Sequence, residues 1–166
     1  MTELSPPPPM NGRDPANLRG DAMSGERYHS REFAQREWDM LWTRIWHVAG
    51  RTAELEEAGD YVVHNFMKES VICVRQHDGS VKAFYNSCAH RGMRLVAGSS
   101  SVDAFTCPYH GWRHGLDGVV EHVQDANDFP QGNPCGKARL KELRCETWGG
   151  FVWYTMDHSA PSLHDY

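Results

Sequence analysis

The sequence lacks any long hydrophobic run, and this absence restricts where the protein can work. No stretch approaches the roughly 18 consecutive apolar residues that a membrane-spanning helix needs, although 40% of the 166 residues are hydrophobic. Residues 1–10, MTELSPPPPM, contain no basic segment followed by an apolar one, so no secretory or lipidation signal is visible. We therefore expect a soluble protein in the cytoplasm, without a membrane partner.

Positive charge and cysteine are also scarce. Seventeen Lys and Arg stand against 22 Asp and Glu, and the resulting net charge of −5 argues against a nucleic-acid partner. Five cysteines, an odd number, in a cytoplasmic chain are more typical of metal ligation than of a disulfide framework. No segment repeats with a period of about 20 to 50 residues, which argues against a solenoid or propeller.

Large apolar residues are nearly absent from the N-terminal segment, residues 1–28, which contains a run of four prolines at 6–9. Such a segment buries too little apolar surface to offset the entropy lost on ordering. We therefore predict that residues 1–28 form a flexible, proline-rich tail.

A helical pattern follows this tail. Apolar residues recur at steps of three and four from Ala34 to Ile45, which gives one apolar stripe on a helix. Ser30 is suited to the N-cap, and Glu32 would lie in the first turn, where the helix dipole favours negative charge. We predict a helix that begins after Ser30 and ends near Trp46.

Beyond Gly59 the chain is a series of short β runs separated by turn signals. We predict strands at residues 61–66, 70–75, 81–85, 104–107, 119–123, 140–147 and 151–154. Asp-Gly pairs at 78–79 and 117–118 supply the positive φ that tight hairpins require. Residues 124–138 have the composition of a long surface loop, and the serines at 99–101 that of a polar loop tip. The predicted fold is mainly β and antiparallel, with one N-terminal helix.

The segment 88–112 contains the residues with distinctive chemistry. It reads C-A-H-R-G from Cys88 and C-P-Y-H-G-W from Cys107. Each half offers one thiolate and one imidazole on a hairpin loop, and two such loops can hold a 2Fe-2S cluster with two Cys on one iron and two His on the other. We therefore predict a Rieske-type cluster on Cys88, His90, Cys107 and His110.

Imidazole ligands change the redox chemistry of such a cluster. Two ferric ions, two sulfides and two thiolates carry no net charge, whereas four thiolates would leave a dianion, so the mixed cluster accepts an electron more easily. Rieske centres have potentials of roughly −150 to +300 mV, against about −400 mV for plant-type ferredoxins. The alternative is a Cys2His2 zinc site, but zinc sites group their ligands as C-x2-4-C and H-x3-5-H, a grouping that this sequence lacks.

These residues, with Trp112 closing the Y-H-G-W motif, resemble the Rieske domain of the large (α) subunit of bacterial aromatic ring-hydroxylating oxygenases, which are non-haem iron enzymes. The resemblance also includes the tryptophans at 38, 42 and 46, the A-G-D-Y motif at 58–61 and the W-G-G-F-V motif at 148–152, and it covers about residues 30–166. It implies that Cys88 and Cys107 bind the inner iron and that His90 and His110 bind the outer one. Arg91, Tyr109 and Trp112 would then surround the ligands, although each could equally be an ordinary loop or packing residue.

The resemblance further implies a division of the chain and a function. Residues 29–156 would form the Rieske 2Fe-2S domain, and residues 157–166 would begin a linker to a catalytic domain that holds a mononuclear Fe(II). The D-x2-H-x4-H pattern of that domain is absent from the 166 residues, so we expect an N-terminal fragment that cannot hydroxylate a substrate alone.

In such oxygenases, single electrons from NAD(P)H arrive through a ferredoxin or flavin reductase and pass to the mononuclear iron, which oxidises an aromatic ring. The full-length protein would be a homo-oligomer in which the cluster of one subunit serves the catalytic iron of its neighbour. The alternative is a stand-alone Rieske ferredoxin-type electron carrier, against which the aromatic helix at 30–46 counts.

The remaining cysteines and histidines have weaker signals. Cys73 alternates within a β run and is expected to be a small buried hydrophobe. Cys135 and Cys145 could form a disulfide, but free thiols are favoured in the cytoplasm. The histidines at 29, 47, 64, 77, 114 and 122 lack metal-ligand spacing, and we expect core or surface roles for them, with one near the cluster able to tune its potential.

Overall fold

A computed structural model describes residues 25–166. Most of the predicted flexible tail therefore lies outside the described residues, and its last part, from Glu26, belongs to the short helix α1 (Glu26–His29). Within the described part of the chain, no helix has the length and apolar character needed to cross a membrane.

The helix predicted after Ser30 begins as expected but ends earlier. Helix α2 spans Arg31–Glu37, and the backbone N–H of Phe33 donates to Oγ of Ser30 at 3.1 Å, which confirms the N-cap. A π-helical turn, η3, follows at Trp38–Trp42. The predicted end at Trp46 is wrong, because this residue starts strand β1 and is buried there opposite Thr155.

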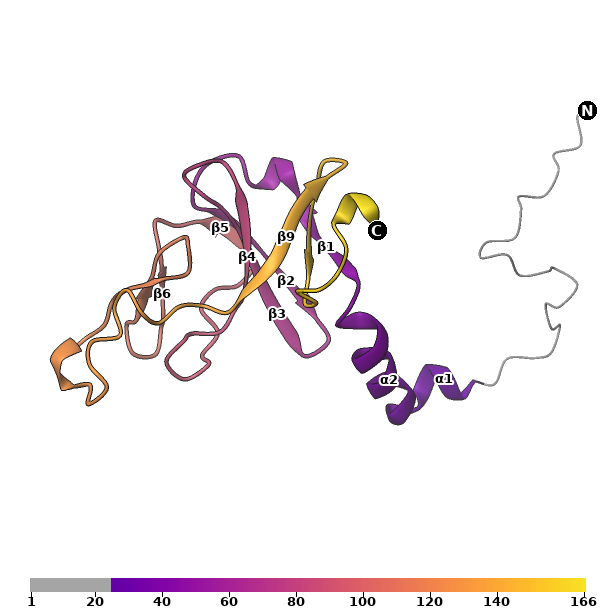
Figure 1. Cartoon of the computed structure of the whole chain (residues 1–166), viewed down its shortest axis with the longest axis horizontal. Coiled ribbons are helices and arrows are strands. Elements are labelled where there is room, and N and C mark those ends of the chain that lie inside the picture. Colours follow the sequence, from indigo (N-terminus) through magenta and orange to yellow (C-terminus); the bar gives the residue numbers. More distant parts are fainter. Residues whose placement is uncertain (1–24) are drawn as a thin grey trace, which may run out of the picture. The chain divides into compact units, whose positions relative to one another are not determined.

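Residues 38–166 form a compact unit built from two antiparallel sheets (Figure 1). The larger sheet has the strand order β1-β10-β9-β4-β3-β2-β5, with β1 at Trp46–Arg51, β2 at Asp60–Phe66, β3 at Glu69–Arg75, β4 at Val81–Tyr85, β5 at Ser99–Ser101, β9 at Glu142–Trp148 and β10 at Phe151–Thr155. The smaller sheet contains β6 (Phe105–Thr106), β7 (Arg113–His114) and β8 (Val120–His122). Three 3-10 turns complete the unit: η4 (Thr52–Glu54), η5 (Ala126–Asp128) and η6 (Leu163–Asp165).

The Asp-Gly hairpins form where the sequence predicts them. Gly79 joins β3 to β4 with φ of +81°, and Gly118 joins β7 to β8 with φ of +82°. These left-handed conformations are accessible to glycine without a steric penalty. Asp78 fixes the first turn, because its Oδ1 accepts from the backbone N–H of Ser80 at 2.9 Å. The predicted mainly antiparallel β fold is thus confirmed.

Strand β3 is buried on both faces and separates two hydrophobic clusters. Ile72 and Val74 point into one cluster, and Val71 and Cys73 into the other, as the alternation of side chains along a strand requires. The first cluster packs β3 and β4 against the small sheet and includes Cys88, Leu95, Phe105, Cys107, Trp112, Leu116, Val120 and Leu140. The small sheet is therefore attached to the large one through the same core that contains both motif cysteines.

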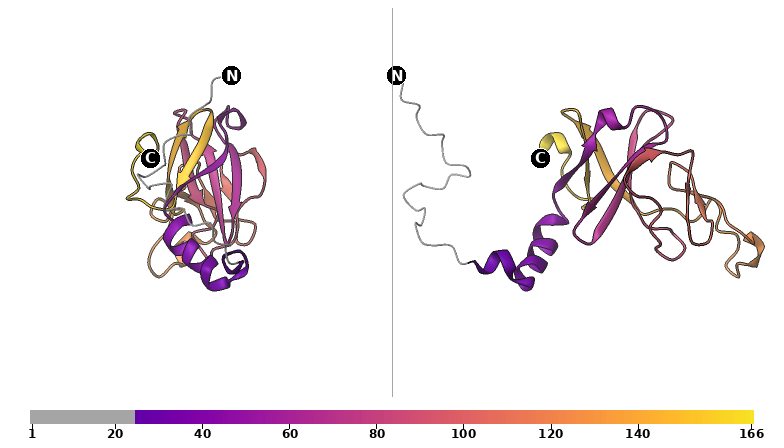
Figure 2. Two further views of the ribbon diagram at one scale, coloured as in Figure 1. Left: turned by 90° about the vertical axis from the view of Figure 1, so that its right-hand side faces the viewer. Right: turned by 180° about the vertical axis from the view of Figure 1, so that it is seen from behind.

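Two segments without a predicted strand or helix are ordered by contacts with the large sheet. The serines expected at a loop tip form β5, which extends the large sheet by pairing Ser100 with Tyr61. The C-terminal segment, residues 157–166, which was expected to begin a linker, ends in η6 beside the strands, as both views of Figure 2 show. Nε1 of Trp46 donates to the carbonyl of Pro161 at 3.2 Å, and the backbone N–H of Leu163 donates to Glu146 at 2.9 Å.

Candidate metal centre

The first motif forms a tight loop at the end of β4. The backbone N–H of Cys88 donates to the carbonyl of Met93 at 2.8 Å, and the N–H of Gly92 donates back to the carbonyl of Cys88 at 2.9 Å. Gly92 has φ of +72°, so its missing Cβ allows the chain to reverse there. His90 lies in the middle of this turn and is held only two residues from the cysteine.

The second motif repeats this construction between β6 and β7. The N–H of Cys107 donates to the carbonyl of Trp112 at 2.8 Å, and the N–H of Gly111 donates to the carbonyl of Cys107 at 3.0 Å. Gly111 has φ of +67°. The two loops therefore share one hydrogen-bonding pattern, and each presents a cysteine at its base and a histidine toward its tip.

The structure brings the two cysteines together in the core. Cys88 and Cys107 are each 3% exposed. Burial raises the pKa of the Cys88 thiol, and its contact with Cys107 raises this pKa further, whereas hydrogen bonds from the backbone of His90 and Arg91 oppose the rise. Two adjacent buried thiolates are unfavourable without a cation, so this pair is suited to binding iron.

The two motif histidines also meet, on the outer side of the loops. The ring centroids of His90 and His110 are 4.8 Å apart, with an angle of 62° between the ring planes. Both residues are half-buried. Burial lowers the pKa of His90, with further contributions from His110 and Arg91, so the neutral imidazole that a metal requires is favoured.

The surroundings of one atom of His90 indicate that a metal group fits this site. Its Nδ1 is buried and has no hydrogen-bond partner, and such orphaned polar atoms are costly unless something binds them. An iron ligated through this nitrogen would satisfy it. In residues 25–166 no three or more His, Cys, Asp or Glu side chains converge on one metal position. The ligands instead form a cysteine pair and a histidine pair, and a two-iron Rieske cluster uses its ligands in such pairs.

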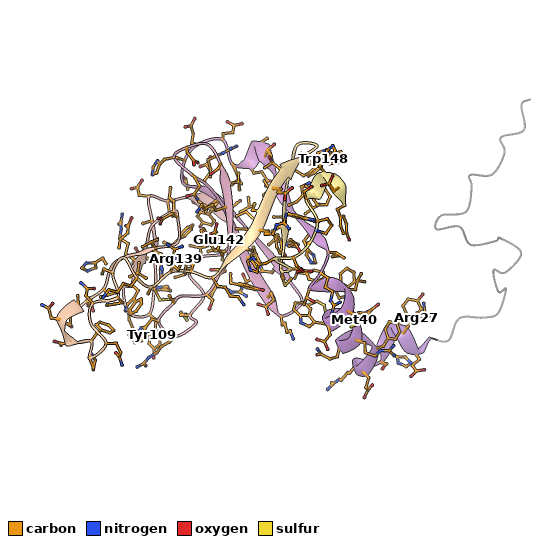
Figure 3. All side chains as sticks on the ribbon, in the orientation of Figure 1. Arg27, Met40, Tyr109, Arg139, Glu142 and Trp148 are labelled. Atoms are coloured by element: carbon orange, nitrogen blue, oxygen red, sulfur yellow. The ribbon has the colours of Figure 1, made fainter. Side chains whose placement is uncertain are left out.

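The three residues expected around the ligands differ in their surroundings. Trp112 is buried, and its ring lies parallel to His90 with centroids 4.7 Å apart and an angle of 3°. Tyr109 is 60% exposed at the outer edge of this half of the domain (Figure 3), where it stacks on His110 at 3.7 Å. Arg91 is exposed to solvent. Both aromatics come from the second loop, where the buried Trp112 orients the His90 ring and the exposed Tyr109 orients the His110 ring.

Two neighbours of the site were not identified as such from the sequence. Asn86 closes the first loop, because its Oδ1 accepts from the N–H of Leu95 at 2.9 Å and its Nδ2 donates to the carbonyl of Val96 at 2.7 Å. His114 places its Nε2 3.5 Å from Sγ of Cys88. His114 comes from β7 of the small sheet, and no local sequence pattern places it beside the cysteine.

The other cysteines have no part in this centre. Cys73 is fully buried, as expected, and its pKa is raised mainly by a hydrogen bond with Cys145 and by burial. Cys145 therefore has Cys73 as its neighbour, while Cys135 packs against the other hydrophobic cluster. All the cysteines are free, in line with the expected free thiols.

Comparisons with known proteins agree with this arrangement. Residues 45–143 match the family described as the Rieske [2Fe-2S] domain. The carnitine monooxygenase oxygenase subunit of Escherichia coli (strain K12) is 34% identical over 139 residues, an alignment that covers 83% of this chain and 37% of that protein. The large oxygenase component of the naphthalene 1,2-dioxygenase system of Pseudomonas aeruginosa is 37% identical over 139 residues, covering 81% of this chain and 31% of that protein.

A solved structure shows the same likeness in three dimensions. A quaternary ammonium Rieske monooxygenase, described in connection with carnitine oxidation and inter-subunit electron transfer, superimposes with a TM-score of 0.78 at 28% identity, over 84% of this chain and 38% of that one. The chain thus spans about a third of the length of the proteins that it matches. It belongs to the Rieske [2Fe-2S] domain family and corresponds to the N-terminal part of Rieske oxygenase α subunits.

Proposed function

We propose that this chain is the electron-entry domain of a Rieske oxygenase. In this proposal Cys88, His90, Cys107 and His110 hold the 2Fe-2S cluster, which receives single electrons from a reductase or ferredoxin and passes them to the mononuclear iron of a catalytic domain. The observation that carries the proposal is the pairing of two buried thiols with two half-exposed imidazoles, one of which has a buried nitrogen without a partner.

The difference in burial supports a division of the proposed ligands between the two irons. Cys88 and Cys107 lie in the hydrophobic cluster and would bind the inner iron, whereas His90 and His110 lie nearer the surface and would bind the outer one. When bound, the cluster supplies a one-electron couple, with the imidazole-ligated iron as the favoured place for the added electron.

The surrounding residues prepare the site for electron transfer. Trp112 holds the His90 ring in one plane and helps keep water from the inner side. Tyr109 covers one face of His110 but leaves its own ring exposed. The edges of the two histidines are therefore where an electron donor and an acceptor can approach, and Arg91 adds a positive charge beside this surface.

The proposal includes the rest of the oxygenase. Residues 157–166 would begin the linker to the catalytic domain, and assembly with a second subunit would bring the histidine edges to that subunit's iron. Support comes from the related monooxygenase, for which inter-subunit electron transfer is described. Aromatic rings are the substrates expected from the sequence, but quaternary ammonium oxygenases match equally well. Product analysis of the complete oxygenase with a carnitine-type and a naphthalene-type substrate distinguishes the two substrate classes.

The reading frame and the redox stoichiometry test the proposal together. We expect the coding sequence to continue past Tyr166 into a D-x2-H-x4-H segment, and we expect the cluster to take up one electron per chain from an NADH-driven reductase under anaerobic conditions. A stop codon directly after Tyr166, together with normal electron uptake, would favour the alternative of a Rieske ferredoxin-type carrier. A cluster-loaded chain that no reductase or ferredoxin reduces would overturn both.

A further inference from the structure

His114 is a fully buried histidine outside the proposed ligand set. It lies on β7, where it pairs with Phe105 of β6 and with Val120 of β8, and it has no exposed surface. Its Nε2 is 3.5 Å from Sγ of Cys88, within the range of a hydrogen bond to sulfur. The rigid pairing on both sides fixes the ring next to the proposed ligand.

The surroundings of the ring determine which nitrogen carries the proton. A cysteine that ligates iron is a thiolate, and its sulfur can only accept a hydrogen bond. The facing Nε2 must then be the donor. The other nitrogen, Nδ1, is buried without a hydrogen-bond partner. The backbone of Gly118 lies nearby and opposes part of the pKa lowering that burial imposes on His114, but it does not reach hydrogen-bond geometry with Nδ1. The thiolate of a loaded site therefore requires a hydrogen on Nε2, and Nδ1 is left without a hydrogen-bond partner among residues 25–166.

We infer that His114 donates an N–H···S hydrogen bond to Cys88 and thereby raises the midpoint potential of the cluster. This inference rests on the proposed ligand role of Cys88. Reduction adds one negative charge to the cluster, and part of this charge resides on the sulfur atoms. A donor aimed at sulfur consequently stabilises the reduced state more than the oxidised state. His114 is thus a residue that tunes the centre through Cys88, and it has no direct contact with a substrate.

The hydrogen bond from His114 differs from the backbone hydrogen bonds to Cys88 because it comes from a side chain. Hydrogen bonds from the backbone of His90 and Arg91 reach Cys88 from its own loop, and no side-chain substitution removes them. The imidazole of His114 approaches from the neighbouring sheet. A side-chain donor can be removed by mutation while the loop stays intact, so its share of the potential can be measured directly.

The test is spectroelectrochemistry of the cluster-loaded chain at a single pH. His114→Phe keeps a planar ring but lacks the donor, and we expect an about tenfold smaller equilibrium constant for reduction, which is about 59 mV for one electron. His114→Gln can place an amide N–H near the position of Nε2 and should restore most of the difference. His47→Phe is the matched control, because His47 is also buried but hydrogen-bonds to Trp42 away from the centre. It should leave the potential unchanged.

A second pair of variants and an EPR experiment test the hydrogen bond from His114 independently. If His114→Phe does not load the cluster, His114→Met and His114→Gln provide a pair of equal length in which only Gln donates, and a lower potential for Met is expected. In the wild-type chain labelled with histidine that carries 15N only in the imidazole ring, pulsed EPR should detect a third, weakly coupled imidazole nitrogen besides the two ligands. Equal potentials in donor and non-donor variants, or no third nitrogen, overturn the role of His114. A wild-type chain without a Rieske EPR signal overturns the proposed function instead.

Discussion

Trp112 connects the hydrophobic core to the metal centre, so its removal should affect both stability and cluster binding. It is 6% exposed, stacks on His90 and meets Phe129 edge-on with ring centroids 5.8 Å apart. Replacement of a buried Trp by Ala costs about 3 to 5 kcal/mol, through lost burial and the cavity that remains. A domain of this size has a free energy of unfolding of about 5 to 15 kcal/mol. Trp112→Ala should therefore lose a large part of the free energy of unfolding.

The same substitution removes the support of a ligand. Without the parallel ring at 4.7 Å, the His90 imidazole can rotate away from the position in which its Nδ1 is presented. We expect a lower iron content per chain after reconstitution and broader EPR lines in the molecules that do load. Trp112→Phe retains an aromatic face and should show a smaller loss in both properties, because part of the stacking remains.

The assays are urea unfolding of the chain and quantification of bound iron. Trp148→Ala is the matched control, since Trp148 is 61% exposed (Figure 3) and exposed substitutions usually change stability by less than about 0.5 kcal/mol. If Trp112→Ala unfolded at the same urea concentration as the wild type and bound as much iron, Trp112 would be neither a core residue nor the support of His90.

Three further substitutions test other parts of the structure. Gly59→Ala should lower the unfolding free energy by more than the roughly 1 to 2 kcal/mol of left-handed strain, because φ is +94° and the new Cβ would lie 2.2 Å from the carbonyl oxygen of Val102; urea unfolding measures this, and an unchanged midpoint would contradict it. Asn86→Ala leaves the backbone groups of the first loop without partners. It should lower the free energy of unfolding by about 1 to 3 kcal/mol and reduce the iron content. A fully loaded variant of wild-type stability would show that the hydrogen bonds of the Asn86 side chain are dispensable. Burial, and then the charge of His47, lower the pKa of His64. Folding therefore favours its neutral form, and its contribution to stability is present above the ordinary pKa of 6.5 and is lost as pH falls through the lowered value. Unfolding curves from pH 7.5 to 5 should consequently show a smaller acid-induced loss for His64→Gln than for the wild type, and equal losses would refute the assignment.

Local sequence signals predicted much of the fold. The alternating apolar residues of β2, β3 and β4 gave strand positions accurate to within one residue, because each strand buries at least one face. Ser30 was recognised as a helix cap for a similar reason, since capping depends on neighbours within three residues. The conformations of Gly79 and Gly118 likewise follow from the turn itself.

The errors occurred where distant residues decide the structure. Three consecutive serines carry no strand signal, and Ser100 is in a strand only because the edge of β2 accepts it. The helical stripe ran to Ile45 and predicted a helix end near Trp46, but pairing with β10 and burial of the Trp46 indole favoured a strand there. In the same way, the order at the C-terminus depends on acceptors and donors from β1 and β9.

In the metal centre too, local spacing predicted some features, whereas contacts between distant residues determined the others. The spacing of Cys88, His90, Cys107 and His110 indicated the ligand set, because each cysteine and its histidine lie within one loop. The approach of His114 to Cys88 joins residues 26 positions apart, and no local pattern encodes that distance. The stacking of Trp112 on His90 likewise depends on how the two loops face each other.

EPR of the dithionite-reduced, anaerobically purified chain, combined with iron and sulfide analysis, tests the central claim most directly. We predict two irons and two sulfides per chain, with an average g value below that of an all-cysteine 2Fe-2S ferredoxin, because two imidazoles replace two thiolates. A colourless, EPR-silent protein that contains zinc, or a spectrum of the all-cysteine type, would contradict the proposed ligand set and the electron-transfer role that depends on it.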